Sequence, residues 1–327
     1  MYLEPIPFSI TFWQSIPVLL PLMLFFSILG SIEFFLLFLP AVYWCYDRRL
    51  GIRLALILII SQGLNEILKV AFHSPRPYWV SPDINVRSTY GSFGLPSGHA
   101  QDAVCVWGML AFHVRRAWAF ALALMLILLI GLSRIYLNAH FPIDVVAGWA
   151  FGALILLAFL CLESPVSTRL QRLGPERQIL VSFLASLCLP ALYALAMASL
   201  GSWQMPATWS ANALAVTGIA IDPFSPEGIM EASGMIFGIG MGYVLQKRRG
   251  GFAAGGPFDK RLLRYALGMV LLALIWYGLG EVGHDQDAMV FCALSYLRAL
   301  LAGAWVAGGA PLAFMRLGLA DAANDVV

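Results

Sequence analysis

Hydrophobic residues in this chain come in long runs, and polar positions are confined mainly to the short stretches between them. A helix that crosses a membrane needs about 20 mainly apolar residues. Nine runs approach this length: residues 27–46, 51–72, 97–113, 117–137, 143–163, 179–199, 228–246, 264–282 and 289–312. A helix satisfies its own backbone hydrogen bonds inside a bilayer. The pattern therefore predicts an all-α fold, a polytopic transmembrane helical bundle with about nine spans.

The apolar run over residues 15–46 is too long for one membrane-crossing helix, yet it contains no polar loop that would separate two helices. Gly30 is the expected break. Pro17 and Pro21 would interrupt a single long helix, because proline lacks the amide hydrogen of the helical ladder. We therefore expect residues near 5–28 to form an interfacial or re-entrant helix that leads into the first span.

Composition supports a membrane protein, since 60% of the 327 residues are hydrophobic and 12% are charged. Soluble globular proteins contain a larger charged fraction. The net charge is +2 and no block of Lys or Arg is present, so nucleic acid is not an expected partner. Membrane lipids are the expected partners. The composition gives no information on the oligomeric state.

Among the charged residues within predicted spans, where an unpaired charge is costly, three stand apart from the motifs discussed below. They are Glu33, Glu231 and Arg298. We expect all three to face the interior of the bundle. Glu231 and Arg298 could pair between the seventh and ninth spans in a structural role.

Positive charge is distributed unevenly among the connections between spans. Of the 20 Lys and Arg residues, 15 fall in alternate connections, which lie on one face. The positive-inside rule assigns this face to the cytoplasm and leaves the N-terminus outside. The asymmetry fits a bacterial plasma membrane and equally an internal eukaryotic membrane. No C-terminal retention signal is present, so we expect the inner membrane of a bacterial cell.

Three polar segments interrupt the apolar pattern, and all of them fall on the external side. The first closes the second span and reads KVAFHSPRP over residues 69–77; the second opens the third span and reads PSGH over residues 96–99. The third joins the fourth span to the fifth and reads SRIYLNAHFPID over residues 133–144. The order of the spans brings all three to one membrane surface, where their cations and imidazoles indicate an anion site.

The cationic residues of these segments suit a phosphate group. Arg76 and Arg134 present planar forks that bind two phosphate oxygens at once, and Lys69 adds a point charge. Ser97 and Gly98 stand at a helix start, where a hydroxyl and backbone amides can face phosphate oxygens and the missing side chain allows a close approach.

The two histidines suit a covalent mechanism. Asp144 follows His140 by four residues, and a carboxylate that accepts the Nδ1 proton leaves Nε2 free to attack phosphorus. His99 directly follows the phosphate cradle. It can protonate the leaving oxygen and later activate water against a phosphohistidine.

Each segment also has a structural interpretation that involves no catalytic function. Lys69 and Arg76 could be cations at a helix end that reach toward the headgroups, and Arg134 could anchor to lipid. The PSGH segment could be a simple helix start, and His140 with Asp144 a structural pair. All of these readings would have to hold at once on one face of one membrane, so we favour the functional one.

The three segments resemble the signature of the type 2 phosphatidic acid phosphatase (PAP2) superfamily: K-x6-R-P, then P-S-G-H, then S-R-x5-H-x3-D. They match it without substitution, within about residues 60–160. The resemblance implies a helical core and a phosphohistidine mechanism with no metal or other cofactor. The catalytic residues that it implies are His140, His99 and Asp144. The phosphate-binding residues that it implies are Lys69, Arg76, Ser97, Gly98 and Arg134.

Wider strings around these segments are similar to the glucose-6-phosphatase branch, which has nine spans and an external or lumenal site. They are RPYW at 76–79, SRIYL at 133–137 and AHFP at 139–142. We recognise no family motif in residues 165–327. We therefore expect a PAP2-like phosphatase core with an N-terminal interfacial helix over residues 1–164, and additional transmembrane helices over residues 165–327.

The sequence thus predicts an integral membrane phosphatase that hydrolyses a phosphomonoester or diphosphate at the non-cytoplasmic face. A phosphorylated lipid is the expected substrate. A lipid phosphotransferase with an alcohol acceptor, a sugar phosphatase similar to glucose-6-phosphatase, and a non-enzymatic phospholipid-binding or transport protein are the alternatives. The last of these does not require the spacing of His140 and Asp144.

Overall fold

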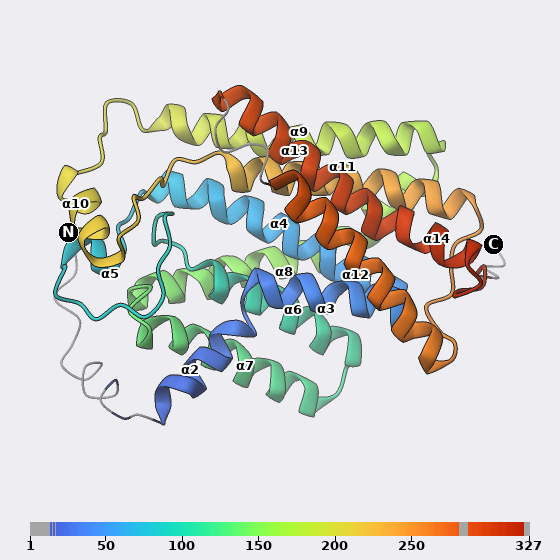
Figure 1. The fold of residues 1–327 in the computed structure, drawn as a ribbon, viewed down its shortest axis with the longest axis horizontal. Helices are drawn as coiled ribbons and strands as arrows, with labels where there is room; N and C mark the ends of the chain where they lie inside the picture. Colours follow the sequence, from blue (N-terminus) through green and yellow to red (C-terminus); the bar gives the residue numbers. More distant parts are fainter. Residues whose placement is uncertain (1–13, 15, 17, 281–286, 324–327) are drawn as a thin grey trace. The chain divides into compact units, whose positions relative to one another are not determined.

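A computed structural model describes residues 14, 16, 18–280 and 287–323 of the chain. Over these ranges it contains helices and no β-strand, apart from an isolated bridge between Phe252 and Ala322. The helices are α2 (Leu19–Ile28), α3 (Ile32–Cys45), α4 (Arg48–Phe72), α5 (Pro77–Val80), α6 (Gly98–Val114), α7 (Ala117–Tyr136), α8 (Pro142–Gln171), α9 (Pro175–Ser199), α10 (Ala207–Thr217), α11 (Glu227–Arg248), α12 (Phe258–Gly280), α13 (Ala288–Ala304), the π-helical turn η1 (Trp305–Gly309) and α14 (Ala310–Arg316) (Figure 1).

Each of the nine predicted spans corresponds to a helix or a helix pair in the structure. Within the described ranges, seven helices are long and apolar enough to cross a membrane, and the bent pair of α2 and α3 brings the number to eight. Helix α6 has 17 residues, which is about the lower limit for a span. The prediction of an all-α bundle of about nine spans is confirmed.

The predicted break at Gly30 is also confirmed. Helices α2 and α3 meet at an angle of 52° on either side of it. A Cβ at Gly30 would lie 2.6 Å from Ile130 and 3.6 Å from His99, so a side chain does not fit between the bend and these residues. Part of the predicted interfacial helix, residues 5–13, 15 and 17, lies outside the described residues, and Leu19–Ile28 of it forms α2.

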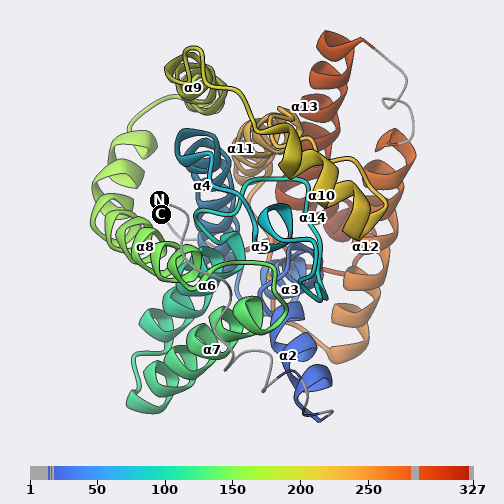
Figure 2. The same cartoon turned by 90° about the vertical axis from the view of Figure 1, so that its left-hand side faces the viewer.

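The described residues group into two compact units, and neither is one continuous segment. The first unit comprises residues 1–35, 64–157 and 195–225. Within it, α6 and α7 pack against each other, and Leu126 and Ile130 of α7 meet Phe26 of α2. Helix α10 packs on α5 (Figure 2). Five buried residues there form what we call the aromatic cluster: Tyr78, Trp79, Phe93, Trp209 and Ala213.

The second unit comprises residues 36–63, 158–194 and 226–327. Its helices α11 and α13 pack so closely that a side chain at Gly234 or Gly238 would collide with backbone carbonyls of α13. Arg298 of α13 forms ion pairs with Glu231 and, at 3.0 Å, with Glu227 of α11. The predicted pairing of Glu231 with Arg298 is therefore confirmed.

The expectation that Glu33 faces the interior is wrong, because this side chain is exposed. Glu33 lies in the first turn of α3, directly after the break. A carboxylate there is favoured by the partial positive charge of the helix N-terminus.

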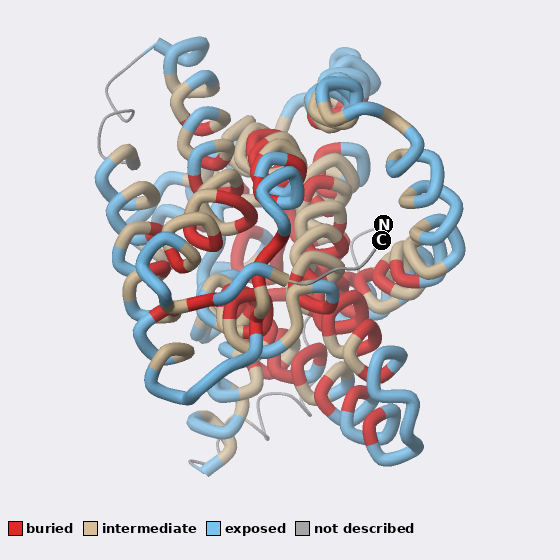
Figure 3. Tube along the Cα trace, turned by 90° about the vertical axis from the view of Figure 1, so that its right-hand side faces the viewer, coloured by how far each residue is buried: buried red, intermediate tan, exposed pale blue. Residues whose placement is uncertain are grey.

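The compact units do not follow the order of the chain. The sequence suggests a boundary at residue 164, whereas residues 195–225 group with the PAP2-like segment. Buried positions, red in Figure 3, alternate with exposed positions along the helices.

Candidate active site

The first polar segment begins in the last turn of α4. Lys69 Nζ donates hydrogen bonds to Glu66 Oε1 at 3.2 Å and to Ser92 Oγ at 3.1 Å. The helix ends because His73 takes a left-handed backbone conformation, with φ of 38°, and Pro75 disfavours a helical residue before it. The chain then turns and presents Arg76 at the start of α5.

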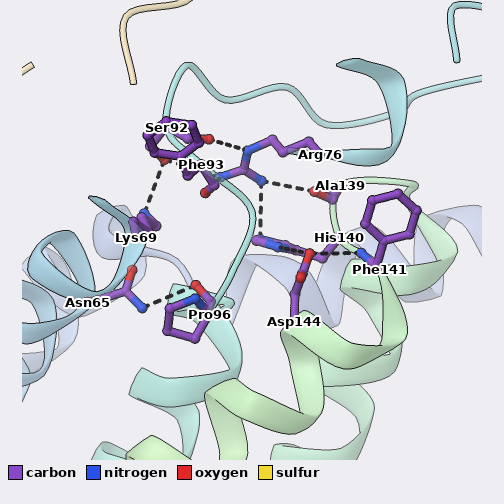
Figure 4. A network of polar contacts seen from close by, with 10 residues as sticks. All are labelled: Asn65, Lys69, Arg76, Ser92, Phe93, Pro96, Ala139, His140, Phe141 and Asp144. Carbon is purple, nitrogen blue, oxygen red and sulfur yellow. Dashed lines mark hydrogen bonds and ion pairs between the residues drawn. The ribbon is translucent and has the colours of Figure 1, made fainter. Parts of the chain in front are cut away.

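Arg76 is the centre of the polar network, and its guanidinium binds two other chain segments (Figure 4). Nε donates to Ser92 O at 2.6 Å, and Nη2 donates to Ser92 Oγ and Phe93 O, both at 3.2 Å. Nη1 donates to Ala139 O at 2.9 Å and to His140 Nε2 at 3.2 Å. The side chain is 1% exposed. Arg76 thus ties the loop before α6 to the turn before α8.

The PSGH segment forms the start of α6, as expected. Ser97 is the N-cap residue, but its side chain makes no capping hydrogen bond, and its buried Oγ has no partner among the described residues. Asn65 Nδ2 of α4 holds the segment through Pro96 O at 3.3 Å. A Cβ at Gly98 would lie 3.1 Å from Asn65 Oδ1, so glycine allows this close approach.

Arg134 lies in the last turn of α7 and is fully buried. Nη1 donates to Ser27 Oγ of α2, and Nη2 donates to Ser88 Oγ at 3.4 Å. Its Nε is buried without a partner in the part of the chain that the structure describes. The guanidinium is thus anchored at one end and keeps an unused donor.

His140 lies in the turn between α7 and α8, and its neighbours fix its tautomer. Arg76 Nη1 can only donate, so Nε2 of His140 must accept and Nδ1 must carry the hydrogen. Nδ1 then donates to Asp144 Oδ2 at 3.3 Å, and the backbone N–H of Phe141 donates to the same oxygen at 2.9 Å. The lone pair of Nε2 is therefore on the side of Arg76.

The environment of His140 favours the neutral ring. The residue is 4% exposed. Burial lowers the pKa of His140 well below its usual 6.5, and the charges of Arg76, Arg134 and Lys69 lower it further. A neutral imidazole whose Nε2 carries a lone pair and no hydrogen is a nucleophile.

His99 is the second residue of α6. Its Nε2 is buried and has no hydrogen-bond partner among the residues described. His99 is also one of the groups whose charge acts on His140. The structure therefore brings the two sequence-predicted histidines into one electrostatic environment.

Buried polar atoms without partners are rare in proteins and call for an explanation. In the described ranges, several of them belong to this one site: Asn65 Oδ1, Ser97 Oγ, His99 Nε2, Arg134 Nε and Asp144 Oδ1. Ser97 Oγ and Arg134 Nε are donors, and His99 Nε2 is one in the matching tautomer. Donors beside buried cations fit an anion with several oxygens, such as a phosphoryl group.

The sequence motifs did not reveal every residue of the network. Ser92 accepts hydrogen bonds from both Lys69 and Arg76, yet it belongs to no motif and lies in an irregular loop. Glu66 contacts Lys69, as its spacing of three on a helix suggests. No comparable periodic signal marks Ser92. The described residues contain no group of three or more His, Cys, Asp or Glu side chains that could hold a metal.

Comparison with known proteins extends the resemblance beyond the motifs. A model described as PAP2 superfamily matches residues 50–166. A second, described as PAP2 superfamily phosphatase, transmembrane extension, matches residues 230–322. The second match lies in residues 165–327, where we recognise no family motif in the sequence.

Individual relatives act on different phosphorylated compounds, as their names state. Lipid phosphate phosphatase delta of Arabidopsis thaliana is 31% identical over 51% of this chain and 43% of its own length, so the chain spans less than half of that protein. Undecaprenyl-diphosphatase of Sulfolobus acidocaldarius is 27% identical over 53% of this chain and 80% of its own. Glucose-6-phosphatase 3 of Rattus norvegicus is 25% identical over 82% of this chain and 81% of its own.

A crystal structure of a transmembrane PAP2-type phosphatidylglycerolphosphate phosphatase from Bacillus subtilis is 24% identical. It covers 48% of this chain and 84% of its own length, with a TM-score of 0.40. The two family matches together cover more than half of the 327 residues. The chain therefore belongs to the PAP2 superfamily, and it is similar to the glucose-6-phosphatase branch of that superfamily.

Proposed function

We propose that this protein is an integral membrane phosphatase that hydrolyses a phosphorylated lipid, a monoester or diphosphate, through a phosphohistidine on His140 and without a metal. The observation that carries the proposal is the fixed tautomer of His140. Asp144 accepts from Nδ1, and Nε2 faces the guanidinium of Arg76. The attacking atom thus lies beside a phosphate-binding group.

In the first step, Nε2 of His140 attacks phosphorus, and the bond from phosphorus to the leaving oxygen breaks. His99, protonated at Nε2, gives its proton to that oxygen, so a monoester releases a neutral alcohol and a diphosphate releases the corresponding lipid monophosphate. Asp144 stabilises the positive charge that develops on the ring of His140. The product of this step is the phosphohistidine.

In the second step, His99 takes a proton from water, and the water oxygen attacks the phosphohistidine. The bond from phosphorus to Nε2 breaks, inorganic phosphate leaves, and His140 returns to its neutral form. Lys69, Arg76 and Arg134 stabilise the charge on the phosphoryl oxygens in both steps. Ser97 and the backbone at Gly98 add donors at the start of α6.

The substrate class rests on the surroundings of the site. The described part of the chain contains seven or eight candidate membrane-crossing helices, which would bring the site within reach of phosphorylated lipids. Relatives named for lipid phosphates and for undecaprenyl diphosphate support this choice. A sugar phosphate is the second candidate, because the glucose-6-phosphatase relative matches 82% of this chain.

We propose that the site faces the non-cytoplasmic side of the membrane, in a bacterial inner membrane. Helix α6 begins at the site with Gly98 and ends at the connection that carries Arg115 and Arg116. Positive residues favour cytoplasmic connections, so the opposite end of α6 would face outward. Hydrolysis of a membrane-impermeant phosphate ester by intact spheroplasts would test this orientation.

Phosphate release by the full chain, purified in detergent with a chelator present, tests the proposed activity. The substrates are phosphatidic acid, phosphatidylglycerophosphate, an isoprenyl diphosphate, a sphingoid phosphate and glucose 6-phosphate. We expect His140→Ala to lower kcat by at least about 10³-fold. His113→Ala is the matched control, because His113 is exposed near the other end of α6.

Quenching with detergent at alkaline pH, where the P–N bond of phosphohistidine survives, during turnover of a ³²P-labelled substrate should leave label on the wild-type protein and none on His140→Ala. Phosphate release by His140→Ala at the wild-type rate would sink the phosphohistidine mechanism, and loss of activity with the chelator would contradict metal independence. A transport protein needs sealed membranes, so release from detergent-solubilised protein also separates an enzyme from a transporter.

A further inference from the structure

Tyr90 lies against both arginines of the candidate site, although it belongs to none of the sequence motifs. The Cζ atom of Arg76 is 4.9 Å from the centre of the Tyr90 ring, and the Cζ atom of Arg134 is 5.1 Å from it. Both guanidiniums are almost completely buried. A cation at this distance over an aromatic face is attracted to the ring, more strongly when water is excluded.

The position of Tyr90 is fixed through its backbone by Tyr78. The hydroxyl of Tyr78 donates to Tyr90 O at 2.7 Å and accepts from the N–H of Tyr90 at 2.8 Å. Tyr78 is itself fully buried in the aromatic cluster. One hydroxyl therefore holds both backbone polar groups of Tyr90.

The side chain of Tyr90 is held as well. Ser88 Oγ donates to the Tyr90 hydroxyl at 3.3 Å and accepts from Arg134 Nη2 at 3.4 Å. The pKa of Tyr90 is lowered overall: burial raises it, but Arg134, the hydrogen bond from Ser88 and the charge of Arg76 lower it by more. The phenol thus lies in the positive field of the phosphate-binding arginines.

Tyr90 also borders the proposed proton donor. Its ring centre is 5.9 Å from that of His99, in an edge-on arrangement. Tyr90 is 36% exposed, so part of it is accessible to solvent, whereas Arg76 and Arg134 are buried. A single aromatic side chain therefore contacts both phosphate-binding forks and the acid/base histidine.

We propose that Tyr90 is a positioning residue whose ring holds Arg76 and Arg134 together, so that both forks are set for one phosphoryl group before it binds. This proposal rests on the proposed function of the site. Two buried like charges repel each other, and the ring offsets part of this repulsion. Preorganised groups bind more tightly because they do not need to be ordered when the ligand arrives.

Two substitutions separate this role from simple packing. Tyr90→Phe keeps the aromatic face and loses the hydroxyl, whereas Tyr90→Leu keeps an apolar side chain and loses the face. Inhibition by vanadate reports on the phosphate site, because trigonal-bipyramidal vanadate resembles the transition state and has no leaving group. We expect Tyr90→Leu to weaken vanadate binding about tenfold, and Tyr90→Phe to stay within about threefold of wild type.

Tyr78→Phe is a third variant, which removes the backbone clamp and leaves the ring of Tyr90 intact. We expect its loss of vanadate affinity to fall between those of the two Tyr90 variants. Tyr46→Leu serves as the control, since Tyr46 is 69% exposed and has no part in the site. Melting temperatures in the same detergent report on packing.

Equal vanadate affinity in Tyr90→Leu and Tyr90→Phe would overturn the proposal. So would a lower melting temperature in Tyr90→Leu with unchanged vanadate affinity, which is the result expected of a packing residue. Calorimetric binding of vanadate needs no turnover. A wild-type protein that hydrolyses no tested ester but binds vanadate through Tyr90 would refute the proposed function and support this inference. A wild-type protein that hydrolyses a tested ester, together with unchanged vanadate affinity in Tyr90→Leu, would support the proposed function and refute this inference.

Discussion

Arg76 Nη1 donates a hydrogen bond to Nε2 of His140 over 3.2 Å. The proposed phosphate-binding group thus contacts the proposed nucleophilic atom. A phosphoryl oxygen is a stronger acceptor for a guanidinium than a neutral imidazole is, because both partners are then charged. Binding of the substrate would therefore draw Nη1 away from Nε2 and free the lone pair only when phosphorus is near.

Replacement of Arg76 by lysine should lower kcat/KM by about 10²- to 10³-fold, since one ammonium cannot replace a fork in a preorganised anion site. The same change leaves the carbonyls of Phe93 and Ala139 without their buried donor. We expect the free energy of unfolding to fall by about 1–3 kcal/mol. Steady-state kinetics and thermal unfolding in detergent measure the two effects.

Arg87→Lys is the matched control, because the Arg87 side chain is exposed in the connection between α5 and α6. It should leave both quantities unchanged. An Arg76→Lys protein with wild-type kcat/KM would show that the fork is not needed.

Asp144→Asn should lower kcat by about 10²- to 10⁴-fold and change KM little. The amide is neutral and cannot stabilise the imidazolium that forms, and its NH2 group can impose the wrong tautomer on His140. The variant should still bind vanadate. Asp83→Asn, an exposed change in the loop before α6, should behave as wild type; a similar loss there would point to a general effect of removing charge.

The lowered pKa of His140 predicts a specific dependence of stability on pH. In the unfolded chain this imidazole binds a proton near pH 6.5, while the buried ring binds one only at lower pH. The stability that its neutral form contributes is present above about pH 6.5 and is lost as the pH falls toward the folded pKa. Between pH 7.5 and 5, the melting temperature should therefore fall more steeply for wild type than for His140→Gln. Parallel curves would mean that the pKa of His140 is not lowered.

Gly148 of α8 allows the helix that carries Asp144 to pack on the start of α6. A Cβ at Gly148 would lie 2.6 Å from Ser97 O and 3.0 Å from Ala100 Cβ. Gly148→Ala should therefore push the two helices apart and lower kcat/KM by about tenfold or more, because catalysis is sensitive to displacements of about 1 Å. Gly174→Ala is the control, since nothing lies within 4 Å of that position, and equal activity of the two variants would count against this mechanism.

The parts of the site that the sequence predicts are those that lie on helix ends. Lys69, Arg134 and Asp144 belong to the last or first turns of long apolar helices, so the order of the spans is enough to bring them to one side. Ser92 and Tyr90 lie in the irregular loop before α6, and no periodicity encodes the path of such a loop. Their contacts with Arg76 could be found only in three dimensions.

Among the charged residues within the spans, the sequence likewise predicts some positions correctly and others wrongly. Arg298 and Glu231 lie on helices that pack closely, and their pairing follows from the cost of an unpaired charge in lipid. The same argument predicts wrongly that Glu33 faces the interior, because the bend at Gly30 places Glu33 in the first turn of a new helix. The sequence indicates a break there but not the direction in which the next helix starts.

The grouping of residues 195–225 with residues 64–157 has a consequence for attempts to make a minimal enzyme. A chain trimmed after residue 166, where the first PAP2 match ends, would retain every motif residue. It would lose Trp209, which is buried against Trp79 and Phe93, and Phe93 supplies a carbonyl to Arg76. We therefore expect the smallest active form to include residues 195–225 as well as the motifs. A fragment that contains every motif residue would still lack the aromatic packing behind Phe93, whose carbonyl accepts from Arg76, the proposed phosphate-binding arginine.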